Sequence, residues 1–406
     1  IKDTAVCRVF NRNFIVTGEE IVEVFLNPDV YREFRNAFNE TPLFMYDEEY
    51  KTCFNLFCAV TDRLESCIEY LNGHAETPKT EEDFLSFVMF SCMVLDAVKH
   101  VLKQLDIEKI DEINYFQDIC LSKPLNIEKH KCPTDDKFFE YLRSIMFAHP
   151  FETNRPKFFM KHEIQFSPWV IANNPAMKLR GIKDGVGVRI YSNKFDEIKD
   201  LIFSFDVLKK YIKSQYLLLY LAIAKVKEIV SLKEIEWKKH KINRSLDYLD
   251  ILKEIKDILK LRHEEYYDVE TVIRYMGCKN TLKENLTSVE RFKQGIIEII
   301  PELCDAVDSL NYEMATEKLD YILHQRPWKM HSMANYQLEK IYCDLNETQI
   351  VSKREWALEQ VELFSKEFAK KWVTIIPQEM SFDEIKLLVT VSCYLEKIEQ
   401  EKEKQV

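Results

Sequence analysis

Three side chains suited to phosphate chemistry lie within one short stretch, YLRSIMFAHPFET, at residues 141–153. Arg143 carries a planar guanidinium group whose donors match the oxygens of a phosphate. His149 can transfer protons near neutral pH, and Ser144 offers a hydroxyl group that could hydrogen-bond a phosphate oxygen. These residue types are compatible with a site for phosphoryl chemistry.

Spacing alone is weak evidence for such a site. An arginine followed by four to six residues and a histidine occurs three times, as Arg143/His149, Arg155/His162 and Arg326/His331. Chance gives about one such pair in a chain with 15 arginines and nine histidines among 406 residues. The helical context singles out the first pair, because the arginines of the other two pairs are each followed by a proline, which disrupts a helix.

The pattern DDKFFEYLRSIMFAH predicts a helix over residues 135–149. Pro150 should end it, because the residue before a proline avoids the α conformation. Side chains six positions apart on an α-helix point about 120° away from each other. One copy of this helix therefore would not stack Arg143 over His149, whereas two copies related by a two-fold axis could gather both pairs in one cleft.

The residues R-S-I-M-F-A-H resemble the R-x4–6-H motif of the HEPN superfamily, helical domains best known as ribonucleases in toxin–antitoxin, phage-defence and RNA-processing systems. The resemblance implies a four-helix bundle with the motif near the end of its third helix and an active site at a dimer interface. It covers residues 48–237 by architecture and 143–149 by specific residues. Ser144 stands where the family usually has Asn, Asp or His.

The function that this resemblance implies is metal-independent cleavage of RNA by attack of the ribose 2′-OH, with a homodimer as the active species. Arg143 would hold the scissile phosphate and stabilise the charge of the transition state. His149 would act as the general base or acid. The alternative is a non-catalytic helical scaffold, or an RNA- or partner-binding protein of the same fold, in which His149 only caps the last helical carbonyls.

Apolar periodicity predicts a mainly α protein: a helical bundle with a small β insertion, followed by a second all-helical domain. The resemblance implies that the bundle is HEPN-like. We expect an N-terminal segment at 1–40, the bundle at 41–240 with strands at 166–173 and 185–193 inside an insertion at about 164–193, and the helical C-terminal domain at 241–406. The expected helices lie at 48–73, 81–106, 135–149, 205–237, 244–264, 287–299, 311–325, 332–346, 352–373 and 381–401.

Capping boxes mark four of the expected helix starts, because a Ser or Thr side chain and an acidic side chain three residues later satisfy the first backbone N–H groups. The four pairs are Thr17/Glu20, Thr80/Asp83, Ser352/Glu355 and Ser381/Glu384. FIVT at 14–17 could form a short strand before the first of them.

Composition restricts the remaining possibilities. The net charge of −11 disfavours a globally basic nucleic-acid binder, and the 11 cysteines form no C-x-x-C pair of the kind that structural zinc sites use. No phosphate-binding P-loop, dinucleotide motif or serine-hydrolase motif occurs, so we expect no cofactor and no metal. The most apolar run, YLLLYLAIA at 216–224, is too short to span a membrane. We expect a cytoplasmic protein with reduced thiols and no membrane contact.

A local basic region interrupts the acidic chain at residues 209–244. It contains ten Lys and Arg but only three Glu, and aromatic residues are interleaved among them. Such a region could line an RNA groove, although a solvated helix face explains it equally simply. The candidate RNA-binding side chains are Lys209, Lys210, Lys213, Lys238 and Lys239.

Polar groups at 130–132, 262–268 and 324–331 match no common metal or catalytic spacing and are interpreted as loops or helix ends. The C-terminal domain shows no motif of its own. By elimination, we expect it to sense or regulate, or to bind a protein partner.

Overall fold

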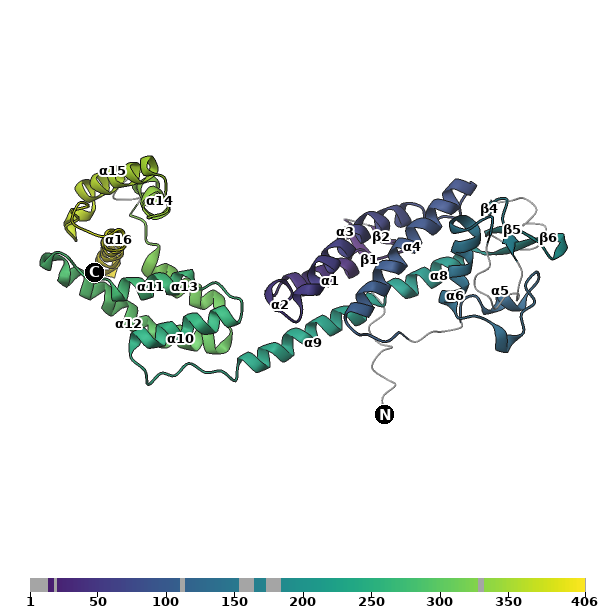
Figure 1. Cartoon of the computed structure of the whole chain (residues 1–406), viewed down its shortest axis with the longest axis horizontal. Coiled ribbons are helices and arrows are strands. Elements are labelled where there is room, and N and C mark those ends of the chain that lie inside the picture. Colours follow the sequence, from purple (N-terminus) through teal and green to yellow (C-terminus); the bar gives the residue numbers. More distant parts are fainter. Residues whose placement is uncertain are drawn as a thin grey trace. The chain divides into compact units, whose positions relative to one another are not determined.

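The computed structural model describes residues 14–17, 20–109, 114–152, 164–172, 184–327 and 332–405. The chain divides into two compact units, Ile1–Val230 and Ser231–Val406 (Figure 1). The structure is mainly helical with a small sheet in the first unit, which confirms the predicted fold class of a mainly α protein with a β insertion. The division falls inside helix α9 (Leu219–Trp237), whereas the sequence placed the domain boundary after this helix, at residue 240.

The described N-terminal segment begins with an antiparallel hairpin of β1 (Phe14–Thr17) and β2 (Glu20–Glu23), in which Thr17 pairs with Glu20. The strand at 14–17 is therefore confirmed, but the capping box at Thr17 is wrong. Both four-residue segments are rich in β-branched residues, which favour extended pairing over a helix start. The first helix is α1 (Asp29–Asn39), followed by the short α2 (Leu43–Tyr46).

The helical bundle of the first unit is built around α4 (Glu81–Gln104), which contacts α3 (Lys51–Gly73), α6 (Asp135–Arg143) and α8 (Phe205–Tyr216). The predicted capping box of Thr80 and Asp83 is confirmed, with both of its hydrogen bonds present. A short α5 (Gln117–Leu121) precedes α6. The single helix predicted over 205–237 is instead two helices, because a turn at residues 217–218 separates α8 from α9.

By length and composition, α4 is the one helix in the described part of the chain that could cross a membrane. The same apolar character is what the centre of a helical bundle needs. Its side chains Phe84, Phe87 and Val98 are at most 2% exposed. Burial of each such side chain contributes about 1.5–3 kcal/mol, so α4 organises the core of the first unit.

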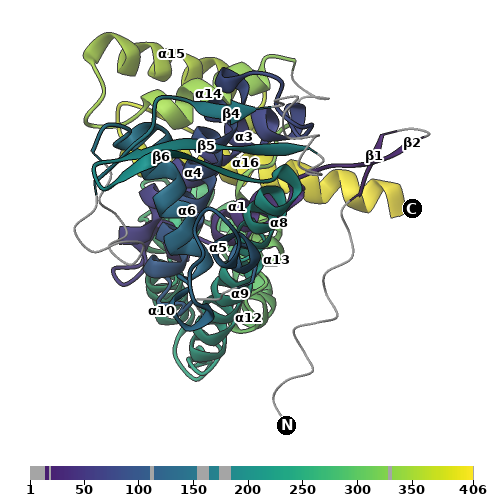
Figure 2. The same cartoon turned by 90° about the vertical axis from the view of Figure 1, so that its right-hand side faces the viewer.

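The sheet of the first unit is antiparallel and is centred on β5 (Gly185–Ser192), which pairs with β3 (Gln165–Phe166), β4 (Val170–Ala172) and β6 (Phe195–Ser204). Figure 2 shows β4, β5 and β6 running alongside one another. The predicted strand at 166–173 is split because Pro168 has no N–H group to pair. The sequence missed β6, whose charged residues obscure its alternation. A Cβ atom on Gly187 would overlap the carbonyl oxygen of Leu201, so glycine is required there.

The described part of the second unit is helical, as predicted, and its core lies along α16 (Phe382–Gln405), whose side chains from Leu387 to Val389 are fully buried. Its other helices are α10 (Tyr248–Leu261), α11 (Tyr267–Gly277), α12 (Leu286–Ser309), α13 (Tyr312–Leu323), α14 (Ala334–Asp344) and α15 (Val351–Glu367). α10, α13, α14 and α15 lie close to the predicted ranges. The helical pattern did not reveal α11, and it ended α12 before Pro301, which the helix in fact contains.

The two capping boxes predicted in this unit fare differently. Ser352 lies inside α15, whose N-cap is Ile350, so that box is wrong. Ser381 does cap α16, because its hydroxyl accepts from the backbone N–H of Glu384 at 3.2 Å. The Glu384 carboxylate, however, accepts hydrogen bonds from the N–H and hydroxyl groups of Thr281, both at 2.6 Å. Only half of the second box is therefore formed, because a tertiary contact takes the acidic side chain.

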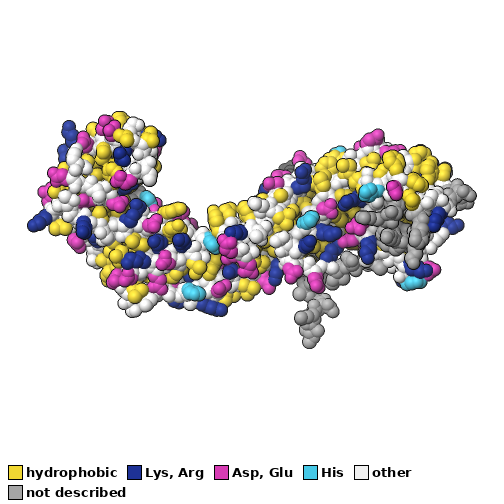
Figure 3. Space-filling view, in the orientation of Figure 1, with side chains coloured by type: hydrophobic (Ala, Val, Ile, Leu, Met, Phe, Trp, Pro, Cys, Tyr) yellow, Lys and Arg dark blue, Asp and Glu magenta, His cyan; other side chains and the backbone are white. Residues whose placement is uncertain are grey.

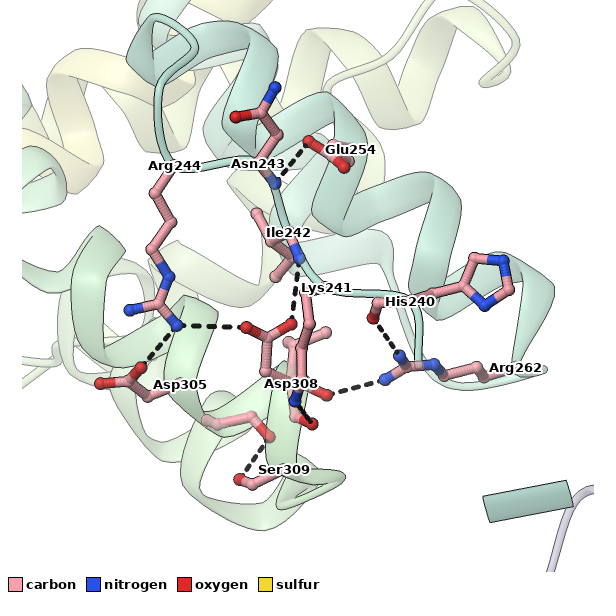
Figure 4. Close-up of polar contacts among 12 residues, drawn as sticks. His240, Lys241, Ile242, Asn243, Arg244, Glu254, Arg262, Asp305, Asp308 and Ser309 are labelled. Atoms are coloured by element: carbon pink, nitrogen blue, oxygen red, sulfur yellow. Dashed lines mark hydrogen bonds and ion pairs between the residues drawn. The ribbon is translucent and has the colours of Figure 1, made fainter. Parts of the chain in front are cut away.

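A buried arginine stabilises the start of the second unit through hydrogen bonds to backbone carbonyl groups. Figure 4 shows Arg262, which is 1% exposed, with its guanidinium group turned toward backbone carbonyls. It donates to the carbonyl oxygens of Val307 at 2.7 Å, Trp237 at 2.8 Å and His240 at 3.3 Å. Arg262 itself is the C-cap of α10, and Trp237 ends α9. The positive charge thus lies where helix C-termini concentrate negative partial charge.

Candidate functional site

Helix α6, which carries Arg143, is held at its N-terminus by a buried carboxylate. Asp135 is 4% exposed, and its oxygens accept hydrogen bonds from the backbone N–H groups of Asn114, Tyr115 and Phe116 at 3.0–3.1 Å. Hydrogen bonds to a charged acceptor are among the stronger ones in proteins. This anchor fixes the start of the helix.

The C-terminal end of the same helical segment changes geometry immediately after Arg143. Residues Ser144–Ala148 form a π-helical turn, closed by a 2.7 Å hydrogen bond from the N–H of His149 to the carbonyl oxygen of Ser144. The predicted helix over 135–149 is thus helical to Ala148, with α6 followed by this wider turn. His149 itself is not helical, with φ of −142°, and Pro150 follows. Single π turns of this kind are frequent at functional sites.

Arg143 is exposed and only loosely paired. Its Nη1 lies 3.7 Å from Oδ2 of Asp96 on α4, and the two side chains are 44% and 59% exposed. Ion pairs between such exposed groups contribute about 0–1 kcal/mol. An incoming phosphate could therefore displace Asp96 from Arg143 at little cost.

Arg143 lines a small hollow of about 80 Å³ bounded by side chains of α4, α6 and α8. Lys99 and Lys109 add positive charge to its lining, and Asp96, Asp136 and Glu140 add negative charge. The hydroxyl of Tyr211 donates to Oδ1 of Asp136 at 2.9 Å, and Lys109 also pairs with this carboxylate. Burial and the neighbouring Asp136 raise the pKa of the Tyr211 phenol, so that it stays a hydrogen-bond donor.

Ser144 and His149 lie outside the lining of this hollow. Ser144 is buried, at 7% exposure, whereas His149 is exposed. Within one chain, the structure therefore places Arg143 in a pocket and His149 beyond it, which agrees with the angular separation expected from a helix. The hollow by itself therefore does not bring the two side chains together.

The five candidate RNA-binding lysines are divided between the two units. Lys209 and Lys210 on α8 both pair with Asp206, at 3.5 and 3.0 Å. The hydrogen bond from Lys210 is the main cause of the lowered pKa of the Asp206 carboxyl group. Lys213, one turn further along α8, is half-buried.

Lys238 and Lys239 are exposed just after α9, in the second unit. On the face seen in Figure 3, Lys and Arg side chains are interspersed with Asp and Glu over both units. On that face the basic residues do not gather into one large patch.

Sequence reasoning did not identify the charged neighbours of Arg143, namely Asp96 and Lys99 on α4 and Lys109 after it. The strong apolar pattern of α4 indicates a core helix and does not reveal the polar residues at its edge.

The pair Arg155/His162 and residue His331 lie outside the described residues. His324 contacts Asp268 at 3.0 Å, and Arg262 is structural, so the polar groups around them are explained by local contacts.

Comparison with known proteins gives no relative for this chain. No family model matches it, and no curated protein or solved structure matches it either. Among the described residues, no group of three or more His, Cys, Asp or Glu side chains is placed to hold a metal ion.

Proposed function

We propose that this protein is a metal-independent endoribonuclease of the HEPN type that acts as a homodimer in the cytoplasm. The observation that carries the proposal is the arrangement of two exposed side chains, Arg143 and His149, at the two ends of a π-helical turn. The loose pairing of Arg143 with Asp96 leaves its guanidinium group able to take a phosphate. The thiol state of the described cysteines is compatible with a reducing compartment.

In the proposed reaction, His149 of one copy removes the proton from a ribose 2′-OH, whose oxygen attacks the adjacent phosphorus. Arg143 binds the phosphate oxygens through paired N–H donors and stabilises the negative charge that develops on them. The bond to the 5′-oxygen breaks, and a protonated histidine of the dimer donates a proton to that leaving group. The products carry a 2′,3′-cyclic phosphate and a 5′-OH. The need for a 2′-OH makes RNA the substrate.

In this proposal Ser144 does not bind the phosphate through its hydroxyl group, as its residue type alone suggests. Its carbonyl oxygen closes the π turn, and its side chain is buried. We therefore propose that it positions Arg143 and His149. Lys209, Lys210 and Lys213 lie on one face of α8 and would add electrostatic attraction for an RNA strand, with Lys238 and Lys239 as separate contacts.

The test is a cleavage assay on mixed cellular RNA with EDTA present. Wild type should cut and leave 2′,3′-cyclic phosphate ends, and His149→Ala should lose about 10²–10⁴-fold in rate, the usual contribution of a general acid–base group. His240→Ala is the matched control, because His240 is also exposed but lies in the other unit. Equal cutting by wild type and His149→Ala would refute the proposed role of His149.

A second candidate function is a scaffold that binds a protein partner through the second unit. It is favoured by exposed apolar side chains on α14 and α15, where Tyr336 is 39% and Trp356 44% exposed. The indole N–H of Trp356 donates to the Tyr336 hydroxyl at 3.2 Å, so the two rings form one surface feature. If the scaffold role is correct, RNA stays intact in the cleavage assay and Trp356→Ser abolishes partner binding while Arg143→Ala does not.

A further inference from the structure

The second half of α9 is a helical segment that the rest of its chain leaves uncovered. The buried residues of this helix are Leu219, Ala222, Ile223 and Val226, all in its first half. None of the residues from 227 to 237 is buried. Helices in proteins gain most of their stability from packing an apolar face against a neighbour. An apolar face on this half of α9 is therefore a candidate contact surface.

Two apolar and two charged side chains form one exposed stripe on this half of α9. Leu232 and Ile235 are 58% and 54% exposed. Glu228 precedes Leu232 by four positions, and Lys239, in the turn that directly follows the helix, comes four positions after Ile235; both are exposed. Spacings of four, three and four place the side chains on one helix face, and they are the spacings that line the seam of a coiled coil. We call these four residues the α9 stripe.

The charges of the α9 stripe decide in which direction a second copy of the chain can pair with it. In a parallel pair each stripe residue would face its own counterpart, so that Glu228 would meet a glutamate and Lys239 a lysine. In an antiparallel pair centred between positions 233 and 234, Glu228 faces the partner subunit's Lys239, and Leu232 faces the partner subunit's Ile235. Opposite charges then meet at both ends, and apolar side chains meet in the middle. The α9 stripe is thus self-complementary in the antiparallel direction.

We propose that two copies of this chain form a two-fold symmetric dimer by antiparallel pairing of their α9 stripes. Glu228 lies 3.0 Å from Lys225 of its own helix, and both side chains are at least 38% exposed, so exchange of this ion pair for one with Lys239 costs little. The stripe buries only two apolar side chains per copy, which is less than a stable interface of about 1,000 Å² requires. The dimer should therefore dissociate on dilution.

This pairing supplies a contact for the homodimer of the proposed ribonuclease, and it rests on the proposed function for that use alone. It engages Lys239, one of the candidate RNA-binding lysines, and leaves the neighbouring Lys238 available to an RNA strand. Dimer formation is measured without RNA, so a failure of the α9 contact and a failure of RNA cleavage are separate results.

The experiment is sedimentation velocity of the full chain at low ionic strength, from low to high micromolar concentration. The mass should rise from that of one 48.4 kDa chain toward twice that value as the concentration increases. Glu228→Lys and Lys239→Glu should each weaken the dimer about ten-fold, because symmetry turns two attractive charge pairs repulsive at once. The double variant should restore wild-type dimerisation, because it exchanges the charges of both pairs.

Two further variants sharpen the test. Lys238→Glu is the matched control, because it makes the same charge change as Lys239→Glu at an exposed position outside the α9 stripe, and it should leave dimerisation nearly unchanged. Leu232→Gln should weaken the dimer without unfolding the chain, because the replaced side chain is exposed and glutamine favours helices. A monomer at the highest concentration overturns the proposal, as does a dimer that Leu232→Gln leaves unchanged. Failure of the double variant to restore dimerisation overturns the antiparallel pairing.

Discussion

Replacement of Arg262 by methionine should destabilise the second unit strongly. The guanidinium group is 1% exposed and satisfies three backbone carbonyl oxygens, two of them at 2.7 and 2.8 Å. Methionine fills a similar volume but donates no hydrogen bond. Hydrogen bonds from charged donors contribute about 1.5–3 kcal/mol each. The carbonyl oxygens of Val307 and Trp237 each keep one backbone N–H donor, at 3.2 and 3.1 Å, so the loss is that of the charged bonds alone.

The two short hydrogen bonds account for most of the expected loss in unfolding free energy. Part of that loss is offset, because the methionine variant no longer buries a charge away from water. We therefore expect a loss of about 3–5 kcal/mol in the free energy of unfolding. For a unit of this size, such a loss lowers the Tm of its transition by about 10 °C. The physical reason is that the carbonyl groups at the ends of α9 and α12 lose their shared donor.

The assay is differential scanning calorimetry of the full chain, together with urea unfolding followed by circular dichroism. Arg274→Ala is the matched control, because Arg274 is 50% exposed and lies 3.5 Å from Asp383, a surface pair worth less than about 1 kcal/mol. A loss below about 1 kcal/mol in Arg262→Met would refute the reasoning. Equal losses in the two variants would also refute it.

Three further predictions test the site and its supports. Asp135→Ala should cost about 3 kcal/mol in unfolding free energy, because three backbone N–H groups, of which that of Phe116 is buried, lose their charged acceptor; a near-wild-type urea midpoint would contradict this. The hydrogen bond to Asp268 raises the pKa of His324, so its stabilising contribution should be fully present below about pH 6.5 and should disappear as the pH rises through the raised value. The stability difference between wild type and His324→Gln should therefore be larger near pH 5.5 than near pH 8 in urea titrations, and a pH-independent difference would refute the assignment. Finally, mixed dimers of Arg143→Ala with His149→Ala retain one arginine and one histidine on different copies, so they should recover part of the RNA cleavage that each variant lacks alone; no recovery despite proven mixed dimers would exclude a composite site.

Local sequence determined much of the secondary structure. The Thr80 cap and the apolar periodicity of α3 and α4 were enough to place both helices, because these signals act within one or two turns. The failures occur where a distant contact decides. Glu384 leaves its capping box for Thr281, and α12 continues through Pro301 as part of a packed helix. β6 forms because β5 pairs with it along most of its length, which its own charged residues do not indicate.

The sequence by itself also identified Arg143, Ser144 and His149 as residues whose side chains could take part in catalysis. It further predicted that a single helix would hold the arginine and the histidine apart. Only the tertiary structure decided how each side chain is presented. It set Arg143 beside Asp96 at the edge of a hollow, buried Ser144, and left His149 exposed after a π turn. The physical reason is that residue type and spacing fix which groups are available, whereas their exposure and partners depend on the packing of α4, α6 and α8, which are distant in the sequence.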